Sequence, residues 1–546
     1  MRKTTIFFFL IIFGLGIQYS NACTNILVSK GASKDGSVMI SYNADAGGFM
    51  DPLYWADAAD WGPNDSLEIY EWDTGKYLGK IKQVAHTYKV VGNMNEYQVA
   101  IGETTNGGRE VLLSPNGIMD YGSMMYVALQ RAKTAKEAIK IMTDLANEYG
   151  YGSAEGETFS VSDANEAWIL EVVSKGAKEK GIIWVARRVP EGYIAAHANQ
   201  ARIREVPTKD KENCMYSPDI FTFAEKMGFW DSKSGKEFSY VDAYVPLDLG
   251  GLYLCEGRVW SIYRRAAPSQ TFSVDYWRGV KGADPYPLFI KPDKKLSVQD
   301  VEALMRDHFE GTDYDMTKGL MAGPFNCPYR WKGLYWKAPG DTITEYGWER
   351  PISTQQTAFS FVAQSRSFLS NSLGGVFWYG LDDTYSNCYM PLYVCMTDRP
   401  KSFEKADVTT FDYNSASWVF NLVSNYAYSK YVYIIKDIQA VQKEFEDGFF
   451  ALQPSVEKTA AELEKTDSTL AVKYLSDYSY THAELVVARW KELLNYIIVT
   501  YNDGYINDGS EKGRHPKGVG YGSEWLKKVL KDQPEYYKIE WTEPKK

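Results

Sequence analysis

The order of hydrophobic and polar positions predicts strands near the beginning of the chain, followed by helices. Apolar runs at residues 23–29 and 37–43 are separated by a turn-rich connector, which predicts two strands joined by a turn. From residue 120 to residue 149 apolar positions recur at helical spacing, and Thr134 and Glu137 form a capping-box signature within this stretch. The start of the chain therefore predicts a sheet accompanied by helices.

Four further apolar runs predict two β-hairpins. Residues 158–161 and 167–173 flank a polar turn, and residues 182–189 and 193–197 flank Pro190-Glu191-Gly192. Strands, a pair of helices and then more strands are typical of antiparallel sheets covered by helices. The predicted fold class is therefore α+β.

The pattern becomes mainly helical beyond about residue 406, with amphipathic stretches at residues 470–475 and 483–498. Before it, residues 208–348 are irregular and rich in Gly, Pro and aromatic residues. The chain contains no internal repeat and no low-complexity linker. We therefore expect one sheet-containing domain at residues 23–405 and a helical region at residues 406–546 that packs on it.

The first 22 residues have the composition of a secretory signal peptide. Two basic residues precede an apolar run at residues 6–17, and Ser20-Asn21-Ala22 suits cleavage before Cys23. We expect residues 1–22 to be removed and the mature protein to be secreted or periplasmic. The apolar run is too short to span a bilayer and no later run is long enough, so we expect no stable membrane insertion.

Cleavage at this point would give Cys23 both a thiol and a free α-amine, a complete nucleophile and base within one residue. Two other roles stay open: acylation as a lipoprotein anchor, and pairing in a disulfide after export. However, Ser20-Asn21-Ala22 lacks the aliphatic residue that usually precedes a lipid anchor, and residues 24–28 begin a β-like run instead of a flexible linker. The pattern favours the nucleophile interpretation.

Composition narrows the function classes. The 546 residues are 45% hydrophobic and 24% charged, as in soluble globular proteins. The formal net charge of −10 disfavours nucleic-acid binding. The six cysteines include no CxxC pair and no Cys/His cluster with metal-ligand spacing, so we expect no metal site. Disulfide pairing and assembly into a homo-oligomer stay open.

Ordered motifs along the chain resemble a known family. They are Cys23-Thr24-Asn25-Ile26-Leu27-Val28, Asn43-Ala44-Asp45, Gly102-Glu103-Thr104-Thr105, Ala198-Asn199-Gln200 and Arg258-Val259-Trp260. Together they resemble the dipeptidase A family of secreted cysteine peptidases, which are N-terminal-nucleophile hydrolases related to bile salt hydrolases and penicillin V acylases. The resemblance implies a four-layer αββα sandwich with a helical C-terminal extension, a dipeptide or short-peptide substrate, and no cofactor.

The resemblance also assigns catalytic roles. Asp45 would orient the α-amine or the sulfur of Cys23, although an Asp at the end of a strand is also a common turn residue. Asn199 would help to bind the oxyanion, or would simply cap the next segment. Arg258 would lower the pKa of the thiol, or would be a solvated arginine.

Four further residues modify this picture. Glu103 and Thr104 are carried over as substrate-binding residues; Glu103 could hold a substrate ammonium group, although a charged loop residue is the commoner explanation. Many relatives carry an arginine immediately before the Asn-x-Asp element, where this chain has Tyr42, so one positive charge is missing. His197 could pair with Cys23 as in papain-like enzymes, but those place their cysteine at the start of a helix, so a structural role for His197 is favoured.

The proposed chemistry follows from ordinary pKa values. A thiol titrates near about 8.5 and an α-amine near about 7.7–8.0, so the amine can accept the thiol proton close to neutral pH. The thiolate would attack an amide carbonyl, and water would hydrolyse the resulting thioester. Two alternatives stay open: an amidase of N-acylated amino acids or bile-salt-like amides, and a non-enzymatic lipid-anchored protein that binds peptides or glycans through its aromatic residues.

Overall fold

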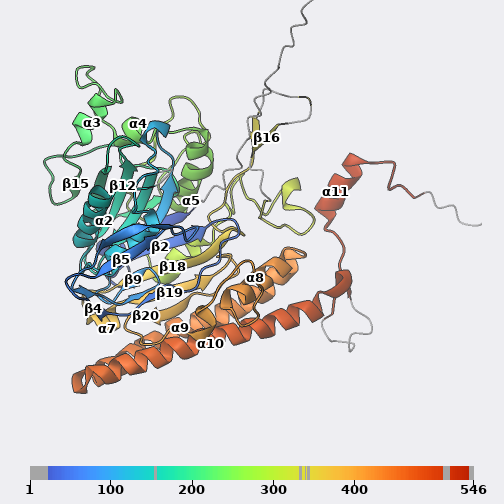
Figure 1. Ribbon diagram of the computed structural model, residues 1–546. Helices are drawn as coiled ribbons and strands as arrows, with labels where there is room; N and C mark the ends of the chain where they lie inside the picture. The colour runs from blue at the N-terminus through green and yellow to red at the C-terminus, as the bar shows by residue number, and fades with distance from the viewer. Residues whose placement is uncertain are drawn as a thin grey trace, which may run out of the picture.

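Two antiparallel sheets form the centre of the molecule in a computed structural model of the chain (Figure 1). The structure describes residues 23–152, 156–330, 335–337, 340, 345–507 and 517–539, so the predicted signal peptide lies outside the described residues. The first sheet has six strands, in the order β14 (Ile194–His197), β1 (Thr24–Val28), β2 (Val38–Asp45), β18 (Thr357–Ser365), β19 (Val376–Leu381) and β20 (Met390–Tyr393). The second has eight, in the order β15 (Cys214–Tyr216), β13 (Ile182–Arg188), β12 (Ala167–Ser174), β11 (Gly156–Ser162), β10 (Ala100–Asn106), β9 (Met94–Asn95), β8 (Val90–Val91) and β3 (Trp55–Ala56).

The two sheets pack against each other. Strands β1 and β2 of the first sheet contact β10, β11 and β12 of the second, and every residue of β1, β2, β11 and β12 is buried. Polar side chains in these strands need hydrogen-bond partners because they are removed from water. Asn43, for example, donates to the carbonyl of Ile352 at 3.1 Å and accepts from the Ser360 hydroxyl at 2.6 Å. The central strands are therefore fixed by both apolar packing and polar contacts.

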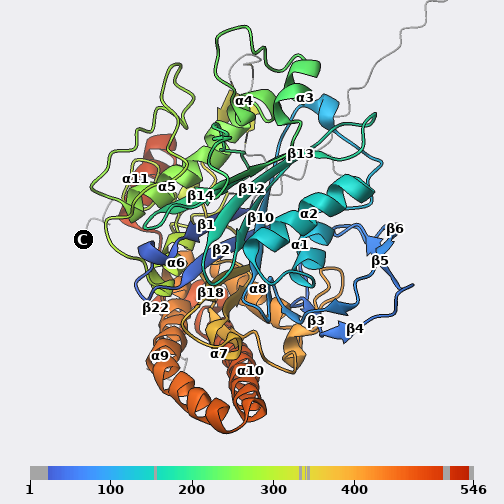
Figure 2. The same ribbon diagram turned by 90° about the vertical axis from the view of Figure 1, so that its left-hand side faces the viewer.

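Helices α1 (Tyr121–Leu129) and α2 (Ala135–Tyr149) contact the eight-stranded sheet and lie beside β10 and β12 (Figure 2). The Thr134 hydroxyl accepts a hydrogen bond from the backbone N–H of Glu137, as expected from the predicted helix start. Gly150 ends α2 with a positive φ of 86°, a conformation that glycine adopts without strain.

Three long helices near the C-terminus cover the six-stranded sheet: α8 (Ala416–Ala427), α9 (Tyr431–Thr466) and α10 (Ser468–Thr500). Helix α8 contacts β19, and α9 and α10 run side by side and contact β20 (Figure 1). Buried Trp490 of α10 stacks on Phe420 of α8, with ring centroids 4.8 Å apart. The helical character predicted beyond about residue 406 is therefore confirmed.

Shorter elements complete the described chain. The remaining helices are α3 (Ile220–Lys226), α4 (Tyr240–Tyr244), α5 (Gly257–Ala266), α6 (Val298–Met305), α7 (Asn371–Gly374) and α11 (Ser523–Asp532). Two-stranded ribbons pair β4 (Ala59–Asp60) with β7 (His86–Thr87), β5 (Ser66–Tyr70) with β6 (Tyr77–Lys82), β16 (Tyr335–Lys337) with β17 (Glu345–Gly347), and β21 (Tyr505–Ile506) with β22 (Lys517–Gly518). Among the described residues, no helix combines the length and the apolar character needed to cross a membrane.

The predicted α+β fold class is confirmed, but two details differ. The second predicted hairpin is wrong, because β13 pairs with β12 and β15 whereas β14 pairs with β1 in the other sheet. Pro190-Glu191-Gly192 therefore turns the chain from one sheet to the other; a turn motif does not determine which strand the next run will join. The region predicted to be irregular, residues 208–348, contains helices α3 to α6.

Candidate active site

Cys23 directly precedes β1, at the point where the two sheets meet. Its side chain is only 4% exposed and lines a narrow pocket with a free volume of about 30 Å³. Strand β10 of the opposite sheet contributes Glu103 and Thr105 to this pocket, because alternate residues of a strand point to the same side. Trp72 and Tyr126 line the pocket as well. The predicted nucleophile therefore lies in a confined site between two rigid elements.

A carboxyl group and a phenol contact the sulfur on one side. Cys23 Sγ lies 3.6 Å from Glu103 Oε1 and 3.5 Å from Tyr42 Oη, and the Tyr42 hydroxyl donates a hydrogen bond to Glu103 Oε1. Burial raises the pKa of the Cys23 thiol well above its ordinary value, and the carboxylates of Glu103 and Asp45 raise it further. Hydrogen bonds from the Tyr42 side chain and the Asp45 backbone act in the opposite direction but do not cancel these effects. These surroundings favour the neutral thiol.

Glu103 is itself a buried acid. It is 2% exposed, and burial raises its pKa to about 7 even though the hydrogen bond from Tyr42 lowers it. Its second oxygen, Oε2, accepts no hydrogen bond from the described residues, and the Glu157 side chain lies close enough to Glu103 to lower its pKa. A cation that enters the pocket would favour the ionised form of Glu103, because an opposite charge stabilises a carboxylate.

Arg258 approaches Cys23 from the other side and holds its backbone. Arg258 Nη1 donates to the carbonyl oxygen of Cys23 at 2.6 Å and to Thr24 Oγ1 at 2.8 Å. Its Nη2 donates to the carbonyl oxygen of Ala198 at 3.2 Å and to Asn199 Oδ1 at 3.0 Å. One buried guanidinium therefore ties the start of β1 to the segment that follows β14.

The helix that carries Arg258 has an unusual beginning. A π-helical segment, Gly251–Glu256, leads directly into α5 (Gly257–Ala266), and such wide turns are frequent at functional sites. Gly257 packs closely on the ring of Trp277, since a Cβ at this position would lie 3.3 Å from it. Burial, and then the charge of Arg350, lower the pKa of Arg258 to about 10, so its guanidinium stays charged at neutral pH.

Asp45 ends β2 and forms a buried ion pair. Arg350 Nη2 lies 3.0 Å from Asp45 Oδ2, and the Thr357 hydroxyl donates to Asp45 Oδ1 at 2.6 Å. The two charged side chains are 0% and 3% exposed. Burial raises the pKa of Asp45 to about 6, against the effects of Arg350 and Thr357. Asp45 is therefore mainly ionised above pH 7.

Arg350 is the functional candidate that sequence reasoning missed. It precedes Pro351 in a segment without regular structure, and no motif there marks it. In space it adds a positive charge beside Asp45, three residues along β2 from Tyr42, where the resemblance led us to expect an arginine. A distant part of the chain therefore supplies positive charge next to the Asn-x-Asp element.

Asn199 adopts a left-handed backbone conformation, with φ of 59°, which asparagine tolerates better than most residues. Its Nδ2 donates to the carbonyl oxygen of Thr105 at 2.6 Å, and its Oδ1 accepts from Arg258. An amide nitrogen carries two hydrogens, so one donor remains for a ligand. The side chain is thus oriented by contacts on both of its polar ends.

Thr104 lies on the opposite side of β10 from Glu103. Its hydroxyl is 2.8 Å from His197 Nδ1, and Ser160 Oγ is 2.8 Å from His197 Nε2. The alternation of side chains along the strand therefore places Thr105, and not Thr104, at the pocket. Burial lowers the pKa of His197 to about 3, with Arg202 and Arg258 acting in the same direction. These contacts agree with a structural role for His197.

The state of the cysteines and the arrangement of possible metal ligands also bear on the chemistry of the site. All six cysteines lie in the described part of the chain and are free thiols, and Cys23 is the one that lines this pocket. Within the described ranges, no group of three or more His, Cys, Asp or Glu residues is arranged to hold a metal ion.

Comparisons with known proteins agree with the resemblance. The model of Peptidase family C69 matches residues 22–55 and 67–444. A probable dipeptidase of Salmonella dublin is 25% identical over 403 residues, which cover 69% of this chain and 82% of that protein. A probable dipeptidase of Latilactobacillus sakei is 26% identical over 407 residues (70% and 76%), and probable dipeptidase B of Streptococcus pyogenes serotype M1 is 22% identical over 506 residues (87% and 92%). Because the family match extends over most of the chain and includes Cys23, this protein belongs to peptidase family C69.

Proposed function

We propose that this protein is an exported cysteine dipeptidase that hydrolyses dipeptides or short peptides through a thioester on Cys23. One observation carries the proposal: the sulfur at the predicted mature N-terminus is buried in a pocket, with its backbone held by Arg258. A residue that was merely an anchor point would have no need of such a site. Family membership and relatives named probable dipeptidases support the reaction class.

The α-amine of Cys23 is the base in this mechanism. It accepts the thiol proton, and the thiolate attacks the carbonyl carbon of the scissile peptide bond. The protonated amine then gives its proton to the departing nitrogen as the C–N bond breaks, which leaves a thioester. Water attacks the thioester and its proton passes to the amine. The C–S bond then breaks to release the acid, and the protonated amine returns its proton to the sulfur, which restores the thiol and the free amine.

Three polar residues assist these steps. The free N–H of Asn199 donates to the oxyanion that forms on the carbonyl oxygen. Arg258 fixes the Cys23 backbone, so that sulfur and amine keep their relative positions. Asp45, held by Arg350, orients the protonated amine, and the positive amine offsets the acidic surroundings that raise the pKa of the thiol.

Glu103 recognises the substrate's own α-ammonium group. In a dipeptide, one carbon separates this ammonium from the scissile carbonyl. Glu103 Oε1 is 3.6 Å from the attacking sulfur, so the ammonium can contact Glu103 while the carbonyl meets Cys23. Binding of the ammonium would favour the ionised form of Glu103. The enzyme should therefore prefer peptides with a free N-terminus.

The proposal includes the architecture of N-terminal-nucleophile hydrolases: a four-layer αββα catalytic domain at residues 23–405, with residues 406–546 as a helical region packed on it. Two sheets in contact, α1 and α2 on one of them, and α8, α9 and α10 on the other support this layering. Residues 1–22 would direct export and be removed.

The test is hydrolysis of Ala-Ala by the wild-type mature protein and by the Cys23→Ala and Cys23→Ser variants. We expect Cys23→Ala to lose all measurable activity and Cys23→Ser to keep a trace at most, with N-acetyl-Ala-Ala a poor substrate of the wild type. Undiminished activity of Cys23→Ala would rule out the mechanism. A preference for the acetylated peptide would instead favour an amidase of blocked substrates.

A further inference from the structure

A second cavity adjoins the Cys23 pocket and has no role in the chemistry described above. Its free volume is about 290 Å³, roughly ten times that of the Cys23 pocket. Trp72, Tyr126 and Phe359 line both spaces, so the two are neighbours that share a wall. The narrow pocket has room for little more than the reacting groups, and any bulkier part of a substrate needs the larger space beside it.

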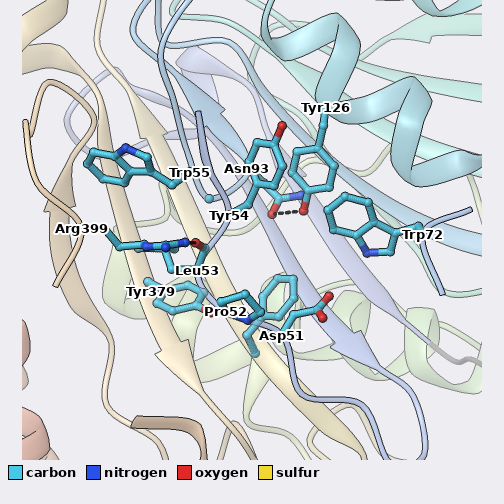
Figure 3. Close-up of a pocket in the computed structure, with 12 residues that line it drawn as sticks. Asp51, Pro52, Leu53, Tyr54, Trp55, Trp72, Asn93, Tyr126, Tyr379 and Arg399 are labelled. Carbon is cyan, nitrogen blue, oxygen red and sulfur yellow. Dashed lines mark hydrogen bonds between the residues drawn. The ribbon is translucent and has the colours of Figure 1, made fainter. Parts of the chain in front are cut away.

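Aromatic rings form the walls of this cavity. Tyr126 stacks on both Tyr54 and Trp72, with ring centroids 3.8 Å and 4.3 Å away, and Tyr54 and Trp72 also contact each other at 5.9 Å. Trp55 and Tyr379 lie toward the other end (Figure 3). Stacked rings form a rigid apolar surface, which suits contact with large apolar or aromatic side chains.

Opposite charges mark the two ends of the cavity. Figure 3 shows Asp51 on the same side as Trp72, while Arg399 lies at the opposite side with Trp55. Arg399 donates one hydrogen bond, from Nη1 to the carbonyl oxygen of Leu53 at 3.0 Å, and forms no ion pair with any described residue. Its guanidinium therefore keeps donors for a ligand.

These charges define a direction for a bound peptide. Glu103 and Asp73 line the Cys23 pocket, and Asp51 lies at the adjoining end of the cavity, so this side suits an ammonium group. Arg399 suits a carboxylate and would repel an ammonium. A peptide would thus place its N-terminus near Cys23 and its C-terminus toward Arg399.

We propose that this aromatic cavity binds the part of a short peptide that follows the scissile bond, with a large apolar or aromatic side chain on its walls and the C-terminal carboxylate at Arg399. This inference rests on the proposed function, since it assumes that Cys23 attacks a peptide. It adds a subsite that selects the leaving portion of the substrate by side chain and by free carboxylate.

The spacing of strands in the six-stranded sheet sets the length of peptide that can reach both Cys23 and the far end of the cavity. Cys23 precedes β1, and Tyr379 is on β19, three strand positions away in the six-stranded sheet. Neighbouring strands are about 4.8 Å apart, which gives about 14 Å across this distance. An extended peptide advances about 3.5 Å per residue, so the carboxylate of a dipeptide stops well short of the far end. A peptide of about three to four residues fits the separation better.

The experiment compares Ala-Ala-Phe with its C-terminal amide, and with Ala-Ala-Gly, by release of the first alanine. We expect the wild type to prefer the free acid over the amide by about tenfold in kcat/KM, as for a charge-assisted hydrogen bond. Arg399→Ala should reduce this ratio to about one, and Arg399→Lys should retain part of it. The preference for Phe over Gly should fall in Trp55→Ala. Lys405→Ala, which removes an exposed cation outside the cavity, is the matched control and should behave as the wild type.

The possible outcomes separate this inference from the proposed function. An acid-to-amide ratio that is the same in wild type and Arg399→Ala, in an enzyme that does cleave the peptide, overturns the subsite alone. If the wild type cleaves no peptide at all, the proposed function fails, and calorimetric binding of Ala-Ala-Phe to the mature Cys23→Ala protein then decides the subsite. Binding that is weakened about tenfold by an added Arg399→Ala change supports it; no binding, or binding indifferent to Arg399, contradicts it.

Discussion

The two sides of Cys23 differ in both charge and task. On one side Glu103 and Tyr42 contact the sulfur itself, and on the other Arg258 contacts the backbone carbonyl of the same residue. The acidic side disfavours the thiolate, because burial and the Glu103 carboxylate raise the pKa of the thiol. On the other side, Arg258 fixes the position of the Cys23 backbone, and Arg350 neutralises Asp45.

If Cys23 is the nucleophile, as proposed, this contrast explains how its reactivity is controlled. A thiol held neutral by its surroundings stays unreactive until a positive group arrives nearby. In the proposed mechanism, the α-amine that cleavage before Cys23 would produce is such a group, and so is the ammonium of a bound substrate. The Glu103 side would therefore suppress reactivity of the thiol in the absence of these cations, while the Arg258 side keeps Cys23 in position. Changes to the two sides should have different consequences.

The largest effect is expected from breaking the Arg350–Asp45 pair. Arg350→Met leaves a buried carboxylate unpaired, which typically costs about 3–5 kcal/mol. Without Arg350 the pKa of Asp45 in the folded state rises above about 6. The loss of stability relative to wild type should therefore grow as pH rises through this value. At pH 5 Asp45 is mainly protonated in both proteins, so the difference should be small. Urea unfolding at pH 5 and pH 8 measures this. Adding Asp45→Asn to Arg350→Met should recover stability at pH 8. A loss of stability that is equal at pH 5 and pH 8 would contradict a stabilising Arg350–Asp45 ion pair.

The next effect concerns the position of the nucleophile. Arg258→Lys keeps the charge but cannot supply the four donor contacts that the guanidinium makes to Cys23, Thr24, Ala198 and Asn199. We expect kcat for Ala-Ala to fall by about a hundredfold, equivalent to about 2.7 kcal/mol. Arg204→Lys, at a surface pair with Asp242, is the control and should retain activity. Wild-type kcat in Arg258→Lys would show that charge alone suffices.

A smaller and opposite effect is expected on the acidic side. Glu103→Gln removes the carboxylate that raises the pKa of Cys23, so alkylation of the thiol by iodoacetamide should reach half its maximal rate at a lower pH than in wild type. The same variant should bind Ala-Ala less well, with KM about tenfold higher, because the ammonium loses its partner. An unchanged alkylation profile would mean that Glu103 does not control the thiol.

The smallest change is expected for Tyr42→Phe. The Tyr42 hydroxyl donates to Glu103 and helps to keep the pKa of this carboxyl near about 7, so its loss should raise that pKa. If ionised Glu103 binds the substrate ammonium, as proposed, activity on free peptides should rise with pH through this value. In the variant the rise should occur at higher pH. We expect kcat/KM to be about threefold lower at pH 7 and close to wild type at pH 9. A pH profile identical to wild type would exclude this role.

The local sequence pattern predicts an element correctly where the residues that determine it are neighbours in the chain. The strands after Cys23, the capped helix at Thr134 and the C-terminal helices could all be predicted, because their periodicity and caps are encoded within a few residues. Pairing between sheets could not: β13 and β14 are separated by a short turn yet join different sheets. Strand partners are chosen by contacts across the whole fold, which no local motif records.

The same limit applies to the candidate site. Cys23, Asp45, Asn199 and Arg258 are carried by motifs that the resemblance identifies. In the structure Arg258 links Cys23 to Asn199, and Arg350 pairs with Asp45. Arg350 lies more than three hundred positions from Asp45 in the chain, so only the folded structure reveals the contact. Thr105, the neighbour of the predicted Thr104, lines the pocket, because adjacent side chains of a strand point to opposite faces.

The most direct test of the central claim compares two forms of the chain that differ by one residue at the N-terminus. One begins at Cys23, with its mass confirming a free, unmodified cysteine, and the other carries a single Ala before Cys23. Both should fold alike and bind Ala-Ala, but the extended form should hydrolyse it at less than about a hundredth of the mature rate, because its Cys23 nitrogen is an amide without basicity. Equal rates for the two forms would contradict the account and assign the role of base to another group, such as Glu103.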